Sequence, residues 1–170
     1  MSELVRDDVH IVAVPVTHPD AVALVEAVQE EYVVRYGGRD DTPLGGHEFG
    51  PGNGAFYVGY AGDEPVVSGA WRWLPLPQGM PWQADRCAEI KRMYVVPSAR
   101  GLGHAHRMLA HLEADAAAQG AEVVVLETGL SQPEAIGLYT SSGYRPVPAY
   151  GHYSCAPASR CFGKALQGSV

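Results

Sequence analysis

Hydrophobic and polar residues follow two different spacings along this chain of 170 residues. Short β-rich runs predict strands, whereas apolar residues that recur every three or four positions predict helices. The predicted strands cover residues 10–16, 55–60, 65–74, 87–96, 122–127, 144–147 and 159–165. Val123 to Leu126 is continuously apolar, which is typical of a strand buried on both faces of a sheet.

The first predicted helix begins at Pro19 and Asp20, because proline at a first helical position and an early acidic residue both favour a helix start. It should end near Tyr36, before Gly37. We expect it to pack on the sheet through an apolar stripe. That stripe consists of Val22, Leu24, Val25, Val28, Tyr32 and Val33.

Two further helices are predicted in the second half of the chain. The helix over 102–119 has an apolar face that packs on the sheet. That face consists of Met108, Leu109, Leu112 and Ala116. Ser131 and Glu134 form a capping box at the start of a third, short helix, and Gly143 suits its C′ position.

The size and composition of the chain indicate a single domain over residues 1–170, because 46% of its residues are apolar and one sizeable core is enough for this length. Residues 39–53 and the proline-rich segment 74–81 show no period and are expected to be surface loops. No apolar run approaches the roughly 20 residues that a bilayer span needs, and the N-terminus shows no leader pattern. We therefore expect a soluble, cytoplasmic protein without a membrane partner.

Charge and cysteine usage exclude several classes of function. A net charge of −7 opposes binding to nucleic acid or to anionic membranes, which need a basic surface. The 3 cysteines, Cys87, Cys155 and Cys161, form no C-x-x-C pair, which suits buried thiols in a reducing compartment. His104 and His111 lie about 10.5 Å apart along one helix, too far to bind one zinc ion directly, so no metal is expected.

A glycine-rich turn joins the predicted strand that ends at Val96 to the helix that follows. The first N–H groups of a helix have no partner within it, and the helix dipole adds partial positive charge, so such a turn favours an anion. Gly101 and Gly103 lack Cβ atoms and would let a phosphate approach the backbone. The spacing fits neither the dinucleotide fingerprint nor the P-loop, which indicates a different phosphate ligand.

This turn, Arg100-Gly101-Leu102-Gly103-His104-Ala105, resembles the Q/R-x-x-G-x-G/A pyrophosphate loop of the GNAT superfamily of acetyl-CoA-dependent N-acetyltransferases. Residues 131–144 are similar to the family's second signature, a short helix carrying A-I-x-L-Y, with Gln132 where the family usually has Asn. The resemblance implies a three-layer α/β (α+β) fold. Its mixed, mostly antiparallel sheet of about six to seven strands would be split at a central V and flanked by about four helices.

The resemblance also implies acetyl-CoA as cosubstrate and a set of contact residues. The residues implied to bind it are Met93, Tyr94, Val95, Arg100, Gly101, Leu102, Gly103, His104, Ala105, Gln132 and Tyr139. Backbone groups of Met93 and Val95 would pair with the pantetheine arm, and N–H groups of 100–105 would hold the pyrophosphate. Tyr139 would protonate the departing thiolate as general acid, the alternative being a packing role between helix and sheet.

Glu89 is the candidate general base, because a carboxylate can take the proton of an incoming ammonium. It lies four residues before Met93, and a strand period of two predicts that both side chains face the same side of the sheet. The alternative is an ion pair with Lys91 or Arg92. Glu127 and Tyr94 are weaker candidates for substrate contact.

Together these features predict an enzyme that transfers an acetyl group to a primary amine of a small molecule by direct attack. The alternatives are acetylation of peptide or protein N-termini and, from another class, a noncatalytic acyl-CoA-binding sensory module. The acceptor depends on residues 37–54, 74–84 and 148–158, which carry no recognisable motif. The sequence leaves a homodimer open.

Overall fold

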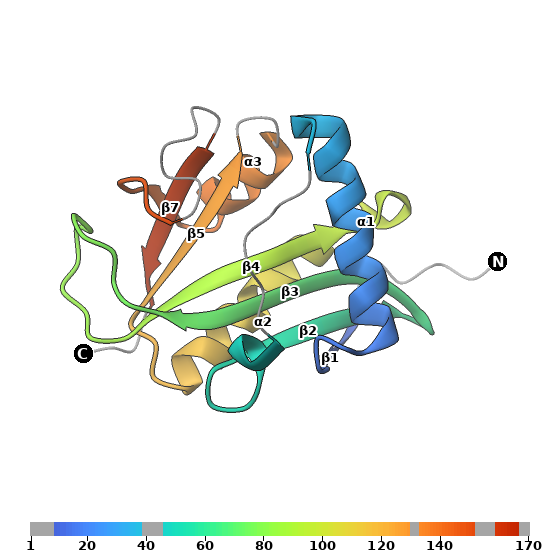
Figure 1. Ribbon diagram of the computed structural model, residues 1–170, viewed down its shortest axis with the longest axis horizontal. Helices are drawn as coiled ribbons and strands as arrows, with labels where there is room; N and C mark the ends of the chain where they lie inside the picture. Colours follow the sequence, from blue (N-terminus) through green and yellow to red (C-terminus); the bar gives the residue numbers. More distant parts are fainter. Residues whose placement is uncertain (1–8, 39–45, 130–132, 152–158, 167–170) are drawn as a thin grey trace.

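A mixed sheet of 7 strands forms the middle layer of the protein (Figure 1). The computed structural model describes residues 9–38, 46–129, 133–151 and 159–166. The strands are β1 (Val9–Ala13), β2 (Gly54–Ala61), β3 (Glu64–Leu74), β4 (Cys87–Val95), β5 (Val123–Gly129), β6 (Arg145–Pro146) and β7 (Ser159–Ala165). Their order is β1-β2-β3-β4-β5-β7-β6, in which β4 and β5 pair in parallel and every other pair is antiparallel. The predicted mixed, mostly antiparallel sheet is therefore confirmed.

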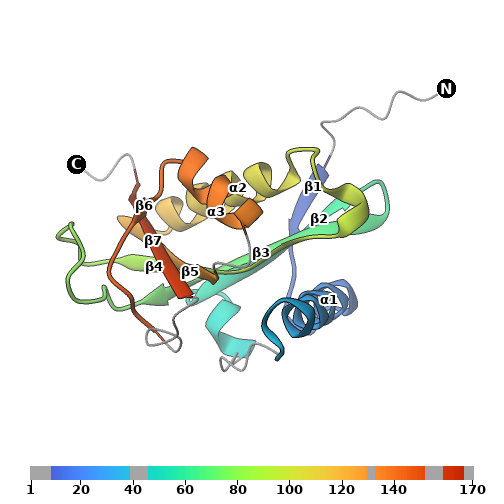
Figure 2. The same cartoon turned by 90° about the horizontal axis from the view of Figure 1, so that it is seen from above.

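Helices cover both faces of this sheet. The α-helices of the described residues are α1 (Pro19–Tyr36), α2 (His104–Ala118) and α3 (Pro133–Ser141), and two 3₁₀ turns are η1 (Gly46–Phe49) and η2 (Pro97–Ala99). Figure 2 shows α1 on one face and α2 with α3 on the other, which confirms the three-layer architecture. Three α-helices are described where about four were expected. None of them offers an apolar stretch long enough to cross a membrane.

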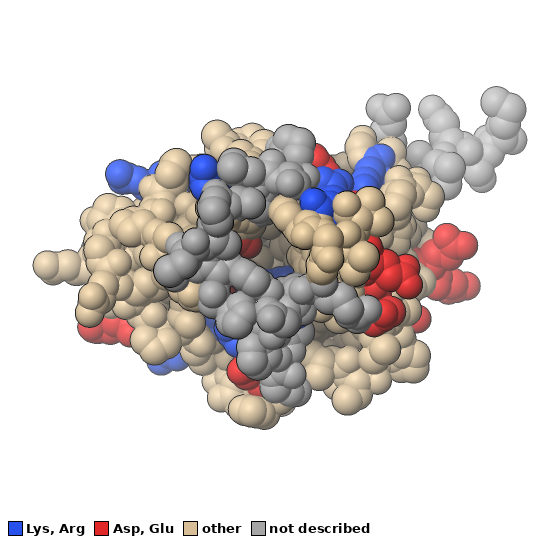
Figure 3. All heavy atoms as spheres, turned by 45° about the horizontal axis from the view of Figure 1, so that its top comes forward, with Lys and Arg blue, Asp and Glu red and all other residues tan. Residues whose placement is uncertain are grey.

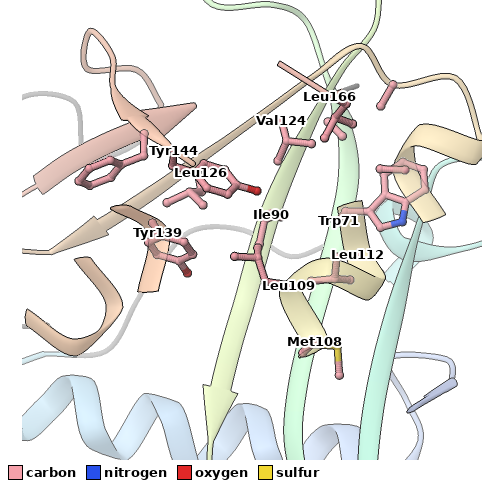
Figure 4. Close-up of a cluster of buried hydrophobic side chains, with 14 of the residues drawn as sticks. Trp71, Ile90, Met108, Leu109, Leu112, Val124, Leu126, Tyr139, Tyr144 and Leu166 are labelled. Carbon is pink, nitrogen blue, oxygen red and sulfur yellow. The ribbon is translucent and has the colours of Figure 1, made fainter. Parts of the chain in front are cut away.

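Helix α2 packs on the sheet through the face that the sequence predicts. Its buried apolar residues are Met108, Leu109, Leu112 and Ala116, which join Ile90 and Leu126 in the largest hydrophobic cluster (Figure 4). Gly69 of β3 lets the helix come close, because a Cβ there would lie 2.7 Å from Leu112 Cδ1 and 2.8 Å from Met108 Cγ. A larger residue at position 69 would push α2 off the sheet and disturb the start of that helix.

Helix α1 has the predicted bounds but a narrower buried face than expected. The His18 ring accepts a hydrogen bond from the Asp20 amide at 3.1 Å, and Gly37 closes the helix in the left-handed conformation. The buried residues are Ala21, Leu24, Val28 and Gln29. Val22 and Val33 are 52% and 46% exposed, so the predicted stripe was too wide. An i, i+3, i+7 row is enough for contact with the sheet.

Two loop segments contribute to the core more than the sequence indicates. Within the predicted loop 39–53, the 3₁₀ turn η1 buries Phe49 against Phe56, with ring centroids 6.3 Å apart. Residues 76–84, between β3 and β4, pack Leu76 and Trp82 onto the sheet face that carries Cys87. This second segment covers the half of the sheet that α1 does not reach.

Candidate active site

A cleft of about 830 Å³ opens where β4 and β5 separate. The two strands pair from Cys87↔Val123 to Ile90↔Leu126 and diverge beyond that point. Residues from α1, α3, the end of β4 and the start of α2 line the cleft. Of the expected contact residues, those on the cleft are Met93, Tyr94, Val95, Arg100, Gly101, Gly103, His104, Ala105 and Tyr139. Leu102 is not among its lining residues, and Gln132 lies outside the described part of the chain.

The end of β4 presents an open hydrogen-bonding edge to this cleft. On the β3 side, the Val96 N–H donates to the Val66 carbonyl at 2.9 Å, and the Arg92 carbonyl accepts from Ser68 Oγ at 3.0 Å. Because backbone groups alternate along a strand, Met93 and Val95 point theirs to the opposite edge, which β5 has left. The Val95 carbonyl accepts a hydrogen bond from Arg100 Nε there at 3.0 Å, and an arm that pairs with this carbonyl would take the place of that side chain. An extended, amide-containing arm could pair there as an added strand.

The start of α2 forms an anion site at the far end of that edge. Gly103 is the N-cap residue, has φ +85° and supplies no side chain to satisfy the first amides. A Cβ at Gly101 or Gly103 would meet no atom within 4 Å, so the space above both glycines is open to a ligand. Burial and the neighbouring Arg107 lower the pKa of His104, which keeps the ring neutral and leaves the positive potential to the helix amides.

His104 gives an independent indication of a polar ligand. Its side chain is buried and lines the cleft, and its Nδ1 atom has no hydrogen-bond partner among the described residues. Buried polar atoms in folded proteins are normally paired. The residues present therefore fit a phosphate-bearing ligand with an amide-containing arm, as acetyl-CoA is.

An ion-pair strap of four residues crosses the mouth of the cleft. Arg100, after β4, pairs with Glu31 of α1 at 2.9 Å. Arg35 pairs with the same Glu31 at 3.0 Å and with Glu134 of α3 at 2.6 Å. On the face shown in Figure 3, acidic and basic side chains lie close together, consistent with such pairs. The strap ties α1 to both walls of the cleft, and Glu31 places a negative charge where an anionic ligand would enter.

Tyr139 lies on α3 and faces both the cleft and the core. Its ring packs against Tyr144, with centroids 5.7 Å apart, and beside Ile90 and Leu126 (Figure 4). Burial, and to a lesser extent Tyr32, raises the pKa of Tyr139, so the phenol keeps its proton at neutral pH. The packing of the ring would hold the phenol rigidly as a proton donor. The two roles considered for Tyr139, general acid and packing residue, are therefore compatible.

A β-bulge in β4 overturns the expected orientation of Glu89. Ala70 pairs with Lys91 and Ser68 with Tyr94, so β4 uses one more residue than β3 over this stretch. The extra residue is absorbed at Arg92, whose φ is +57°. Such a bulge reverses the alternation of side chains. Glu89 and Met93 therefore face opposite sides of the sheet, and the prediction that they share a face was wrong.

Glu89 is held in a buried ion pair away from the cleft. Its carboxylate accepts from Arg72 Nε at 3.0 Å and lies 2.9 Å from Arg72 Nη2, and its side chain is 6% exposed. Arg72 also pairs with Glu48 of η1. The partner is thus the residue directly opposite on β3, rather than Lys91 or Arg92. The cross-strand register of the β3–β4 pair, which the sequence does not fix, determines this partner.

Glu127 is a carboxylate that lines the cleft near the point where β4 and β5 diverge. It follows Leu126, the last residue of β5 that pairs with β4, and it lines the cleft together with Tyr139. Burial raises the pKa of Glu127, and the lowering effects of Ser159, Lys91 and Cys161 only partly offset this. The sequence signal for this position is a single acidic residue directly after the apolar run Val123 to Leu126.

The cysteines provide no reactive thiolate in the described structure. Cys87 and Cys161 are buried and free. Burial raises the pKa of Cys87 to about 12 and that of Cys161 to about 11, so both remain thiols at neutral pH. The predicted buried thiols are confirmed at these two positions, and Cys155 lies outside the described residues. Nowhere in residues 9–38, 46–129, 133–151 or 159–166 do three His, Cys, Asp or Glu side chains gather as metal ligands.

Sequence comparison identifies the family. The profile of the Acetyltransferase (GNAT) family matches residues 21–144, and the chain therefore belongs to the GNAT acetyltransferase family. A protein from Azospirillum brasilense named IAA acetyltransferase is 38% identical over 78 residues, which are 46% of this chain and 51% of that protein. The chain thus aligns with about half the length of this curated relative.

Solved structures share the fold over nearly the whole chain. A Klebsiella pneumoniae protein assigned to the acyl-CoA N-acyltransferases is 28% identical, with a TM-score of 0.73, over 93% of this chain and 97% of that one. A GNAT family acetyltransferase from Elizabethkingia anophelis with acetyl-CoA bound is 14% identical, with a TM-score of 0.63, over 94% of this chain and 99% of that one. At such low identity the second likeness shows the fold alone.

Proposed function

We propose that the protein transfers the acetyl group of acetyl-CoA to a primary amine of a small molecule. The single observation that carries this proposal is the continuity of the donor side. The open edge at Met93 and Val95 leads directly to the uncapped amides of α2, and Tyr139 lines the same cleft. Acetyl-CoA in the Elizabethkingia structural neighbour supports the choice of donor.

Different residues of the chain bind acetyl-CoA, stabilise the oxyanion and donate the proton. N–H groups of 101–105 bind the pyrophosphate, and the edge of β4 orients the pantetheine arm. A backbone N–H near Val95 stabilises the oxyanion that forms when the amine attacks the acetyl carbonyl directly. Tyr139 donates its proton to the departing thiolate. Neither buried thiol is positioned on the cleft, which favours transfer without an acetyl-enzyme.

A small acceptor is favoured over a peptide by the packing of the acceptor face. Leu76, Met80 and Trp82 cover the sheet around Cys87 and Tyr150, and the partly buried Arg72 pairs with Glu89 and Glu48 next to it. The described hollow beside these residues has a volume of about 380 Å³ and is lined by Glu48, Arg72 and Trp73 among others, which suits a small acceptor better than an extended peptide. The relative from Azospirillum brasilense is named for IAA rather than for a protein, which supports the same choice.

The test is CoA release from acetyl-CoA with a panel of acceptors. The panel contains small primary amines, IAA and peptides with free N-termini, and mass spectrometry identifies the acetylated product. We expect turnover of at least one small amine and slower turnover of every peptide. Exclusive acetylation of peptides would replace the proposed acceptor class. Tight acetyl-CoA binding without any turnover would favour the noncatalytic sensory module.

A further inference from the structure

The carboxylates of Glu89 on β4 and Glu127 on β5 lie on the same face of the sheet, and their surroundings differ. Side chains alternate along β5: Val125 packs with Cys87 and Cys161, whereas Leu126 packs with Tyr139 on the opposite face. Glu127 therefore returns to the face of Val125, beside its β7 partner Cys161. Tyr139 and Glu127 approach the cleft from opposite faces of the sheet.

Glu89 is paired with Arg72, whereas Glu127 forms no ion pair with a cation in the described part of the chain. The Arg72 guanidinium holds Glu89 through two nitrogens, at 3.0 and 2.9 Å. Both nitrogens contact the same oxygen, Oε1, which must give up these charge-assisted hydrogen bonds before it can accept a proton. The hydrogen bond at Glu127 is weaker, with Cys161 Sγ donating to Oε2 at 3.8 Å.

The surroundings of Glu127 suit a group that gains and loses a proton. The charged and titratable described groups around it are Glu89 and Lys91 of β4, Cys161 of β7 and Tyr150. Burial and Glu89 raise the pKa of Glu127, and Lys91 lowers it less than burial raises it. A carboxylate whose pKa moves toward neutrality is a better match for an amine substrate at physiological pH.

We propose that Glu127, rather than Glu89, is the catalytic base that accepts the proton of the acceptor ammonium, a role that rests on the proposed acetyl transfer. The ammonium gives one proton to the Glu127 carboxylate, which later releases it to water. The freed nitrogen lone pair forms the C–N bond, and the C–S bond then breaks. The nitrogen loses its second proton to water as the intermediate collapses, while the thiolate takes a proton from Tyr139, which regains one from water.

The test compares Glu127→Gln with the wild type across pH, using the best amine of the acceptor panel. We expect kcat/KM of the variant to fall roughly 10²–10⁴-fold at neutral pH, the range of general base catalysis. The loss should shrink as pH rises and free amine replaces ammonium, by up to about tenfold per pH unit. CoA affinity, measured by calorimetry, should stay unchanged, which separates this role from donor binding.

Further variants keep the assignment falsifiable. Glu127→Asp keeps a carboxylate and should retain the acidic limb of the wild-type pH profile, even if Glu127→Gln folds poorly. Glu89→Gln is the matched control: its remaining activity should show no recovery with pH. A Glu127→Gln profile that overlays the wild type, or a Glu127→Asp variant without the acidic limb, overturns the role of Glu127 alone. A wild type that acetylates no amine overturns the proposed function, and this role with it.

Discussion

The donor side of the cleft, at the end of β4 and the start of α2, differs from the acceptor side of the sheet, around Arg72 and Glu89, in how its polar groups are paired. On the donor side, polar groups lack protein partners within the described residues: these are the first amides of α2 and the His104 ring nitrogen, next to the edge of β4 that β5 leaves after Ile90. On the acceptor side, Arg72 pairs with both Glu89 and Glu48. Polar groups that lack partners at a cleft indicate ligand binding, whereas saturated buried pairs indicate a structural role.

Changing Tyr139 to Phe should have the largest effect on turnover. Phenylalanine keeps the ring contacts with Tyr144 but removes the proton that the thiolate would take. We expect kcat to fall roughly 10²–10⁴-fold with CoA affinity little changed. Steady-state kinetics and calorimetry on the same preparation would measure both. Turnover within about twofold of wild type would instead leave Tyr139 with its packing role and make water the proton donor.

Changing Gly103 to Val should weaken CoA binding on the donor side and leave the residues of the acceptor side unchanged. Position 103 needs φ +85°, and a branched side chain would both strain the turn and occupy the open space above the amides. We expect CoA affinity to fall by about 10²-fold or more. Gly62→Val is the matched control, because Gly62 also has positive φ and open space but lies in the β2–β3 turn. Equal CoA affinity in both variants would remove the glycine turn from the site.

Changing Glu89 to Gln should lower the stability of the protein because it breaks the ion pair with Arg72 on the acceptor side. The partly buried Arg72 guanidinium would lose a charged partner, at a cost of about 1.5–3 kcal/mol in the free energy of unfolding. Urea denaturation at neutral pH would measure this. An unchanged unfolding midpoint with a large loss of kcat would contradict the structural role and return Glu89 to the chemistry.

Changing Glu127 to Gln should have the opposite sign in the same denaturation experiment. The pKa of Glu127 is raised in the folded state, so folding penalises its charged form, and the penalty is fully present above the folded pKa. The glutamine variant should therefore be as stable as wild type or slightly more stable at neutral pH. This difference should vanish below the unfolded pKa of about 4.3, where both states are protonated. A variant that is markedly less stable at pH 7 would contradict the assigned surroundings of Glu127.

Changing Glu31 to Gln, which removes a carboxylate of the ion-pair strap, should have the smallest effect of these variants, a change in CoA affinity. The exposed Arg100–Glu31 pair contributes little to stability, but Glu31 competes with an incoming phosphate for Arg100. We expect CoA to bind up to about fivefold more tightly, with the gain shrinking at high salt. Calorimetry at two ionic strengths would measure this, and weaker binding would mean that Glu31 helps to build the site.

The sequence predicted the elements and the donor side because both depend on local chemistry. Helix α2 starts within two residues of the predicted position, and its four predicted apolar residues are all buried. The turn before α2 could be predicted from Gly101 and Gly103, because positive φ and the start of a helix depend on local sequence. The wide stripe on α1 was wrong because the periodicity marks apolar positions, not which of them meet the sheet.

The acceptor side could not be predicted, because it depends on the tertiary register. A strand period of two cannot reveal the bulge at Arg92, and one extra residue is enough to turn Glu89 to the other face. The pairing of Arg72 with Glu89 likewise follows from how β3 aligns with β4. Glu127 becomes conspicuous only once the divergence of β4 and β5 after Leu126 is known.

A crystal structure of the protein with CoA would test the central claim most directly. We predict that the pyrophosphate lies on the N–H groups of residues 101–105 and that the pantetheine arm runs along the open edge of β4 at Met93 and Val95. The thiol should then lie where β4 and β5 diverge, with Tyr139 on one side and Glu127 on the other. A pyrophosphate bound away from the start of α2, or an arm outside the cleft between β4 and β5, would contradict the account.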